Sequence, residues 1–248
     1  MKKVLITGGT GLLGQAIVKG FLKKKCQVHF TSTTLKNSDK LLKGLTAKEK
    51  KNCFPIIQTF KDINDIKYFI QNYNKIGFNI LINNARDLLN VNFKQDSFEQ
   101  IKNFEIEMFM AIYLPFFLSI KLNKSKLQSI INISSMYGIV APNKKIYTDG
   151  YRSSPSFYGI SKAAQIHLTK ELAVRMAADR IRVNCVSFGG VEGRVNNKFK
   201  KKYANLCPMG RMLKSSEIFE PIWFLANENL SSGSTGHNLI IDGGWTIW

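Results

Sequence analysis

Short apolar runs alternate along this chain with longer amphipathic stretches. The runs have the length of buried strands, and strands are expected at Val4–Thr7, Val28–Thr31, Phe54–Phe60, Ile80–Asn83, Ser129–Ser134, Arg182–Ser187 and Leu239–Asp242. The stretches between them have helical spacing, and helices are expected at Gly11–Lys24, Ile63–Tyr73, Phe104–Leu122 and Ser156–Ala178. This alternation predicts an α/β protein with a doubly wound, mostly parallel, seven-stranded sheet and helices on both faces. With no repeat, linker or composition shift, residues 1–248 are interpreted as one domain.

The composition of the chain excludes several classes of protein. The chain has 248 residues, of which 44% are hydrophobic, so it can bury a sizeable core and is not intrinsically disordered. The longest apolar run, Met108–Ile120, is too short to span a bilayer, and the N-terminus lacks the apolar region of a signal peptide. Four widely spaced cysteines form no CxxC pair. They indicate reduced thiols in a cytoplasmic protein and predict no metal site.

The charge is strongly positive, at +19, with 36 Lys and Arg residues against 17 Asp and Glu. Most of the cations are lysines spread along the chain, with short clusters at Lys23–Lys25 and Lys198–Lys202. No nucleic-acid motif accompanies them, so we expect no nucleic-acid partner. The charge favours either a solvated lysine-rich surface or attraction of an anionic cofactor or substrate.

A glycine-rich turn lies between the first expected strand and the first expected helix. It reads Thr7-Gly8-Gly9-Thr10-Gly11-Leu12-Leu13-Gly14. Glycines allow the backbone to approach a pyrophosphate, and the helix N-terminus adds free N–H groups and a positive dipole. The position of this turn therefore predicts a dinucleotide site.

Tyr158 and Lys162 lie four residues apart in an expected helix, so their side chains share one face. An ammonium beside a phenol stabilises the phenolate and lowers the phenol pKa. Tyr158 is therefore a candidate general acid and base.

Together these residues resemble the short-chain dehydrogenase/reductase family, whose fold is a single NAD(P)-binding Rossmann domain. The resemblance covers the whole chain in order and spacing. It further includes Asp62-Ile63, Asn83-Asn84-Ala85, Asn132-Ile133-Ser134-Ser135, Arg182–Ser187 and Asp242-Gly243-Gly244.

The resemblance implies a hydroxyl–carbonyl oxidoreductase that uses Ser135, Tyr158 and Lys162. Ser135 would hydrogen-bond the substrate oxygen, Tyr158 would transfer the proton, and Lys162 would hold the nicotinamide ribose. The cofactor residues it implies are Gly8, Thr10, Gly11, Leu12, Leu13, Gly14, Ser32, Thr33, Thr34, Asp62, Ile63, Asn84, Ala85, Tyr158, Lys162, Gly189 and Val191. The substrate residues are Arg86, Ser135, Tyr137 and Tyr151. A homodimer or homotetramer, and no membrane partner, are implied in the same way.

Several positions depart from the family pattern. Arg86 stands where the family has glycine after Asn-Asn-Ala, and Ala111 stands where it often has an asparagine that completes a proton relay. Phe188-Gly189 replaces Pro-Gly, and Ser135 and Tyr158 lie 23 residues apart, ten more than is usual.

The second expected strand ends without the acidic residue that NAD enzymes of this fold place there. The hydroxyls of Ser32, Thr33 and Thr34, with Lys36 nearby, instead favour NADP(H), and NAD(H) stays open.

The nearest subgroup resembles enzymes of bacterial surface-glycan and flagellin modification, which act on sialic-acid-like sugars. An anionic substrate is predicted by Arg86 and by the loop inserted between Ser135 and Tyr158, which contributes Lys144, Lys145, Tyr147, Tyr151 and Arg152. Arg194 and the Lys198–Lys202 cluster favour the same substrate class. The alternatives are a 3-oxoacyl-carrier-protein reductase and a catalytically impaired homologue with a regulatory role.

Overall fold

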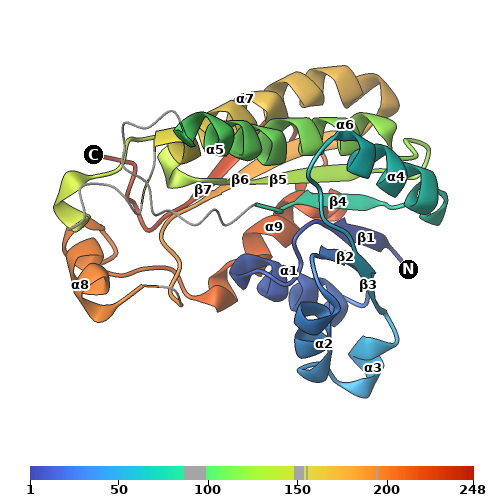
Figure 1. Ribbon diagram of the computed structural model, residues 1–248, viewed down its shortest axis with the longest axis horizontal. Helices are drawn as coiled ribbons and strands as arrows, with labels where there is room; N and C mark the ends of the chain where they lie inside the picture. Colours follow the sequence, from blue (N-terminus) through green and yellow to red (C-terminus); the bar gives the residue numbers. More distant parts are fainter. Residues whose placement is uncertain (87–98, 148–153, 155, 194) are drawn as a thin grey trace.

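A computed structural model describes residues 1–248 except 87–98, 148–153, 155 and 194. Its centre is a sheet of seven parallel strands in the order β3-β2-β1-β4-β5-β6-β7 (Figure 1). The strands are β1 (Lys3–Ile6), β2 (Gln27–Ser32), β3 (Cys53–Ile57), β4 (Ile80–Asn83), β5 (Ser129–Ser135), β6 (Arg182–Phe188) and β7 (Asn238–Ile241). All seven expected strands are present, but the one expected at Phe54–Phe60 already ends at Ile57. The sheet was expected to be mostly parallel, and every pairing in it is parallel.

Helices cover both faces of the sheet (Figure 1). One face carries α4 (Ile63–Tyr73), α5 (Glu99–Met108), α6 (Leu114–Lys121) and α7 (Ser156–Met176). The other carries α1 (Leu12–Lys23), α2 (Leu35–Lys43), α3 (Ala47–Lys50) and α9 (Phe219–Ala226). The short α10 (Glu228–Ser231) follows α9, and α8 (Asn197–Leu206) lies beyond the ends of the strands.

Successive side chains along a strand point to opposite faces of the sheet, where they enter two separate hydrophobic layers. On β1, Val4 and Ile6 face α1 and α9, whereas Leu5 faces α4, α6 and α7. All three are fully buried, which is why the strands of a covered parallel sheet read as continuous apolar runs.

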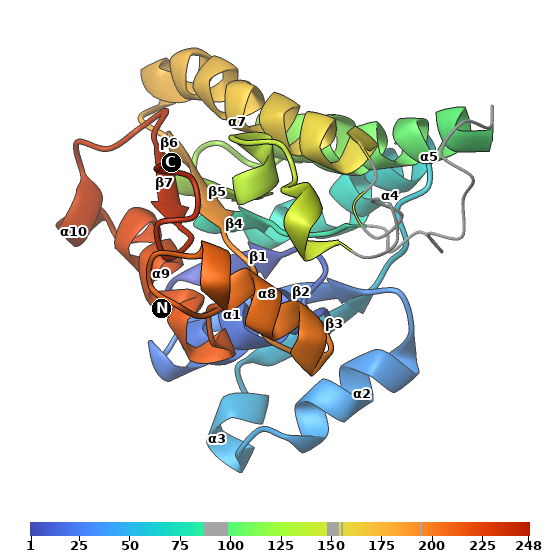
Figure 2. The ribbon, with the colours of Figure 1, turned by 90° about the vertical axis from the view of Figure 1, so that its left-hand side faces the viewer.

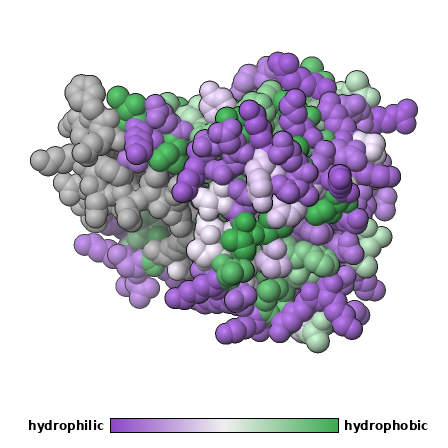
Figure 3. Space-filling view, turned by 45° about the vertical axis from the view of Figure 1, so that its right-hand side comes forward, coloured by the Kyte–Doolittle hydropathy of each residue, from purple (hydrophilic) through white to green (hydrophobic). Residues whose placement is uncertain are grey.

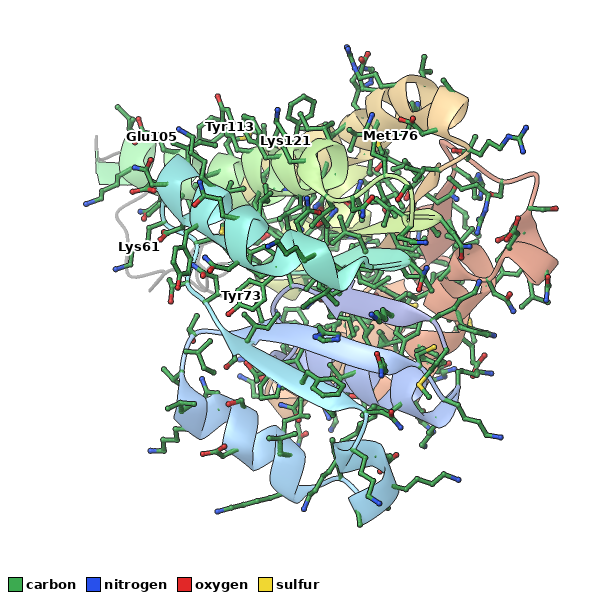
Figure 4. All side chains as sticks on the ribbon, turned by 90° about the vertical axis from the view of Figure 1, so that its right-hand side faces the viewer. Lys61, Tyr73, Glu105, Tyr113, Lys121 and Met176 are labelled. Carbon is green, nitrogen blue, oxygen red and sulfur yellow. The ribbon has the colours of Figure 1, made fainter. Side chains whose placement is uncertain are left out.

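The long helix expected at Phe104–Leu122 differs from that expectation. It begins earlier, at Glu99, and a π-helical turn over Phe109–Tyr113 separates α5 from α6. Pro115 lies two residues after that turn, and because proline has no N–H it donates no backbone hydrogen bond there. Glu105, Tyr113 and Lys121 follow one another along this continuous rod in Figure 4.

The sequence predicted no apolar run long enough to span a bilayer. The helical stretch Ile101–Lys121 is, however, long and apolar enough to cross a membrane, by length and composition only. It instead forms part of the layer over the sheet. Met110, Leu114 and Leu118 are buried there with residues of α4 and α7. We interpret it as a core helix.

A third hydrophobic cluster lies at the carboxyl edge of the sheet, which faces the viewer in Figure 2. It joins the turn after β5, α8 and the C-terminal segment. Tyr203 of α8 is almost fully buried, and its ring stacks on that of Trp245 at a centroid distance of 4.4 Å. This cluster forms one wall of the edge at which doubly wound proteins bind ligands.

The face of the molecule in Figure 3 is largely hydrophilic, with hydrophobic areas between polar ones. All four cysteines are free and buried, which confirms that they form no disulfide.

Candidate active site

The glycine-rich turn after β1 is shaped by close backbone contacts. Gly8 has φ +68°, and a Cβ on it would lie 2.9 Å from Ala85 Cα. A Cβ on Gly9 would meet the Phe30 ring, and one on Gly14 would meet Gly8 O. Only glycine fits at these three positions, because each Cβ would lie within 3 Å of a neighbour.

Gly11 differs from these three glycines. A Cβ there would contact only Gly8 O, at 3.5 Å, so the turn is open on this side. Gly11 is the N-cap of α1 and provides no side-chain cap, which leaves the first N–H groups of the helix, at Leu12 and Leu13, available. This combination of an open glycine and uncapped amides suits an anionic pyrophosphate.

Asn84 and Ala85 connect this turn to the end of β4. Thr7 Oγ1 accepts the N–H groups of both residues at 3.0 Å, and Asn84 Nδ2 donates to the carbonyl oxygens of Thr7 and Gly8. The side chain of Asn84 therefore fixes the floor of the proposed dinucleotide site.

The end of β2 is also internally bonded. Ser32 Oγ donates to Thr34 O at 2.9 Å and lies 3.5 Å from Thr10 Oγ1, while Thr34 Oγ1 caps α2 by accepting the Asn37 N–H. Thr33 and Lys36 are exposed beside them. Of the three predicted hydroxyls, that of Thr33 is the most accessible to a ligand.

Asp62, predicted to contact adenine, caps α4. Its Oδ1 accepts the N–H groups of Asn64 and Asp65. Ile63 begins that helix and is 37% exposed, so its side chain offers an apolar surface next to the capped turn.

Contacts between β5 and α7 bring the predicted catalytic residues to one place. Ser134 Oγ donates to Lys162 O at 2.9 Å, and a Cβ on Gly138 would lie 2.8 Å from the Lys162 carbonyl carbon. A Cβ on Gly159 would lie 3.0 Å from Tyr137 O. The turn Met136–Gly138 thus packs directly on the helix that carries Tyr158 and Lys162.

The two adjacent serines differ in what their hydroxyls do. Ser134 donates its hydroxyl hydrogen to α7, whereas Ser135 Oγ accepts the Tyr137 N–H at 3.2 Å. Ser135 can therefore still donate to a ligand, which fits its expected hydrogen bond to the substrate oxygen.

Lys162 is buried, with 7% of its surface exposed. Its Nζ donates to Ile133 O and to Gln165 Oε1, each at 3.0 Å, and a third donor remains on the ammonium. Burial is the main reason that its pKa falls to about 8, and the Arg86 charge lowers it further while Glu107 raises it.

A string of buried amides and hydroxyls ends at Gln165. Asn83 Nδ2 donates to Asn132 Oδ1 and Asn132 Nδ2 to Thr169 Oγ1, which donates to the Gln165 carbonyl. Asn83 Oδ1 is buried without a hydrogen-bond partner among the described residues. The string reaches only the backbone of Gln165, whereas it is the Gln165 side chain that accepts from the lysine ammonium.

Arg86 lies beside Tyr158. Its guanidinium carbon is 4.0 Å from the centre of the Tyr158 ring, and its Nε donates to Glu107 Oε1 at 2.8 Å. Glu107, on α5, is 1% exposed. Arg86 is therefore at the predicted site, but with its charge already paired.

The sequence analysis did not identify Glu107, Gln165 or Tyr203. A single carboxylate in the apolar stretch Ile106–Phe117 was the available signal for Glu107. Ala111 is buried within the π-helical turn, so no polar side chain is present at the position of the family asparagine.

The phenol groups of Tyr137 and Tyr147 are 2.7 Å apart, and burial raises the pKa of Tyr137. Tyr147 belongs to the inserted loop, so this contact connects the loop to the turn after Ser135. Of the loop's other predicted residues, Tyr151 and Arg152 lie outside the described residues, as does Arg194.

The segment after β6 completes the edge. Gly189 N–H donates to Ile241 O, Val191 pairs with Leu213, and a Cβ on Gly193 would lie 3.2 Å from Leu12 Cδ1. Gly189 and Val191 thus lead from β6 toward the N-terminus of α1.

Known proteins that are similar to this chain include the following three. Post-translational flagellin modification protein A of Campylobacter coli is 28% identical over 99% of this chain and 98% of its own. The 3-oxoacyl-acyl-carrier-protein reductase FabG of Chlamydia pneumoniae is 30% identical over 99% and 97%. A short-chain dehydrogenase of Leptospira borgpetersenii, solved with bound NAD+, is 30% identical over 99% and 92%, with a TM-score of 0.84.

The family model described as enoyl-(acyl carrier protein) reductase matches residues 11–246, nearly the entire chain. This match and the 30% identical relatives agree with the parallel sheet and the glycine-rich turn. The chain therefore belongs to the short-chain dehydrogenase/reductase family and is an NAD(P)-dependent oxidoreductase.

Proposed function

We propose that the protein interconverts a hydroxyl and a carbonyl group with Ser135, Tyr158 and Lys162. The observation that carries this proposal is the buried ammonium of Lys162, held by Ile133 and Gln165 with one donor left over, one turn from Tyr158. Burying a cation costs free energy, and a residue with a purely structural role would not need to carry that charge.

Each residue has one role in this proposal. Ser135 donates a hydrogen bond to the substrate oxygen. Tyr158 gives its proton to that oxygen in reduction and takes it back in oxidation. Lys162 stabilises the Tyr158 phenolate and uses its remaining donor on the nicotinamide ribose.

The residues present fit a dinucleotide. Leu12 and Leu13 amides would hold the pyrophosphate beside Gly11, and Asp62-Ile63 would border the adenine. When bound, the nicotinamide supplies or accepts the hydride. We favour NADP(H), because no carboxylate is present at Ser32–Thr34 and the exposed Thr33 and Lys36 suit a 2′-phosphate; NAD(H) remains the alternative.

The proposed substrate is an anionic, sugar-derived compound of surface-glycan biosynthesis. The flagellin modification relative supports the pathway class. Because Glu107 already pairs with Arg86, positive charge at the site would come mainly from exposed lysines on α8 and from Lys144 and Lys145 beside Tyr147. We further propose a cytoplasmic homodimer or homotetramer.

A second candidate is a 3-oxoacyl-carrier-protein reductase, which the 30% identical FabG relative favours. The extra residues between Ser135 and Tyr158 weigh mildly against it.

The test is turnover of matched substrates. Nicotinamide fluorescence first measures cofactor binding, and a panel then compares acidic keto-sugars, neutral ketones and a 3-oxoacyl thioester. We expect turnover of the acidic sugars. Faster reduction of the thioester supports the second candidate, and cofactor binding without any turnover supports a regulatory homologue.

A further inference from the structure

Arg86 and Glu107 form an ion pair directly at the proposed proton donor. The guanidinium carbon lies 4.0 Å from the centre of the Tyr158 ring, and the Glu107 carboxylate that holds Arg86 is 1% exposed. An arginine used for substrate would gain most from a free, two-point guanidinium. Here one donor is committed to a buried acid, and the guanidinium carbon lies over the tyrosine ring.

We propose that Arg86, oriented by Glu107, is a positioning residue that stabilises the phenolate form of Tyr158 during proton transfer. The inference rests on the proposed function and assigns Arg86 to the phenol and not to a substrate anion.

The physical basis is the electrostatics of the ring. A guanidinium over the face of an aromatic ring is attracted to the negative face, and the attraction grows when the site is shielded from water. When the Tyr158 O–H bond breaks and the proton moves to the substrate oxygen, the negative charge left behind spreads into that ring. A fixed cation above it therefore interacts more strongly with the phenolate than with the phenol.

Glu107 offsets the electrostatic cost of placing a second cation, Arg86, near Lys162. Arg86 lowers the pKa of Lys162 and Glu107 raises it, so the acid offsets the repulsion between the two cations. Its burial also restricts the guanidinium to one orientation, since Nε is anchored at 2.8 Å. The titratable or charged groups near Tyr158 include Arg86 and Tyr137 from the loops after β4 and β5, Glu107 behind Arg86, and Lys162 on its own helix.

The test uses charge-matched variants. Arg86→Met would leave a buried carboxylate unpaired, so it is combined with Glu107→Gln; Arg86→Lys keeps the charge but loses the guanidinium group. The readouts are kcat and substrate KM of each variant. Each variant is also made in the Tyr158→Phe background, where an effect that acts through the Tyr158 hydroxyl disappears.

We expect kcat to fall by about 3–30-fold in the double variant with substrate KM unchanged, and by less in Arg86→Lys, which keeps the charge. In the Tyr158→Phe background the same changes should barely alter the residual rate, because no phenolate forms there. An unchanged kcat in the double variant overturns the proposal, and so does an equal loss in the Tyr158→Phe background. A raised substrate KM with unchanged kcat also overturns it and would assign Arg86 to the substrate.

Failure of the proposed function has a different signature. If Tyr158→Phe retains turnover, Tyr158 is not the proton donor and the proposed function fails. If Tyr158→Phe loses turnover while the double variant keeps its rate, only the role of Arg86 fails.

Discussion

Lys162 Nζ lies 3.0 Å from Gln165 Oε1, one turn further along α7. Gln165 is itself almost fully buried, and its carbonyl oxygen accepts from Thr169. The position of the ammonium is thus set by its own helix as well as by β5.

Gln165→Leu should weaken cofactor binding. The change removes one acceptor from a buried ammonium, which lowers the lysine pKa further and loosens its position. We expect a roughly 3–20-fold rise in the Kd of the cofactor, measured by nicotinamide fluorescence. His167→Ala is the matched control, because His167 lies exposed on the same helix and its only ion pair among the described residues is with exposed Glu171. Equal effects of the two changes would contradict the assigned role of Gln165.

Activity should fall as pH rises through about 8. Burial depresses the pKa of Lys162 to about 8, so the free enzyme loses this cation above that pH and keeps it below. The measurement is kcat/KM against pH for wild type and Gln165→Leu, and we expect the basic limb to move to lower pH in the variant. A limb that stays fixed would exclude Lys162 as its source.

Two glycines of the first turn should respond differently to alanine. Gly11→Ala should leave the midpoint of thermal unfolding nearly unchanged, because its Cβ meets only Gly8 O at 3.5 Å, but it should weaken cofactor binding by about tenfold or more. Gly9→Ala should destabilise the fold by about 1–3 kcal/mol, because its Cβ would lie 2.6 Å from Phe30 Cβ. Unfolding curves and cofactor titrations on both variants check this. Cofactor affinity of Gly11→Ala equal to that of wild type would contradict the placement of the pyrophosphate beside Gly11.

Cofactor choice should depend on Thr33 and Lys36. Thr33→Asp places a carboxylate beside exposed Thr34 and should reverse a preference for NADPH, because it repels a 2′-phosphate and accepts from a 2′-hydroxyl. Lys36→Ala should weaken NADPH and leave NADH almost unaffected. The measurement is the affinity of each variant and of the wild type for NADPH and for NADH. Tighter binding of NADH by the wild type would refute the preference.

The central strands could be predicted because they are buried on both faces and so read as apolar runs, as at Ile80–Asn83. The glycine-rich turn and the Tyr158/Lys162 spacing are likewise local patterns. The Arg86–Glu107 pair could not be predicted, since it joins a loop after β4 to α5, 21 residues away. Nor could the internal bonds of Ser32 and Thr34, which depend on where β2 ends and α2 begins.

The central claim is that Tyr158 transfers the proton, and Tyr158→Phe tests it most directly because only the hydroxyl is lost. The measurement is single-turnover reduction of the preferred carbonyl substrate, with cofactor affinity determined on the same samples. We predict a loss of about 10²–10⁴-fold in rate with cofactor affinity within about twofold of wild type. A variant that binds cofactor normally and keeps most of its rate would contradict this account.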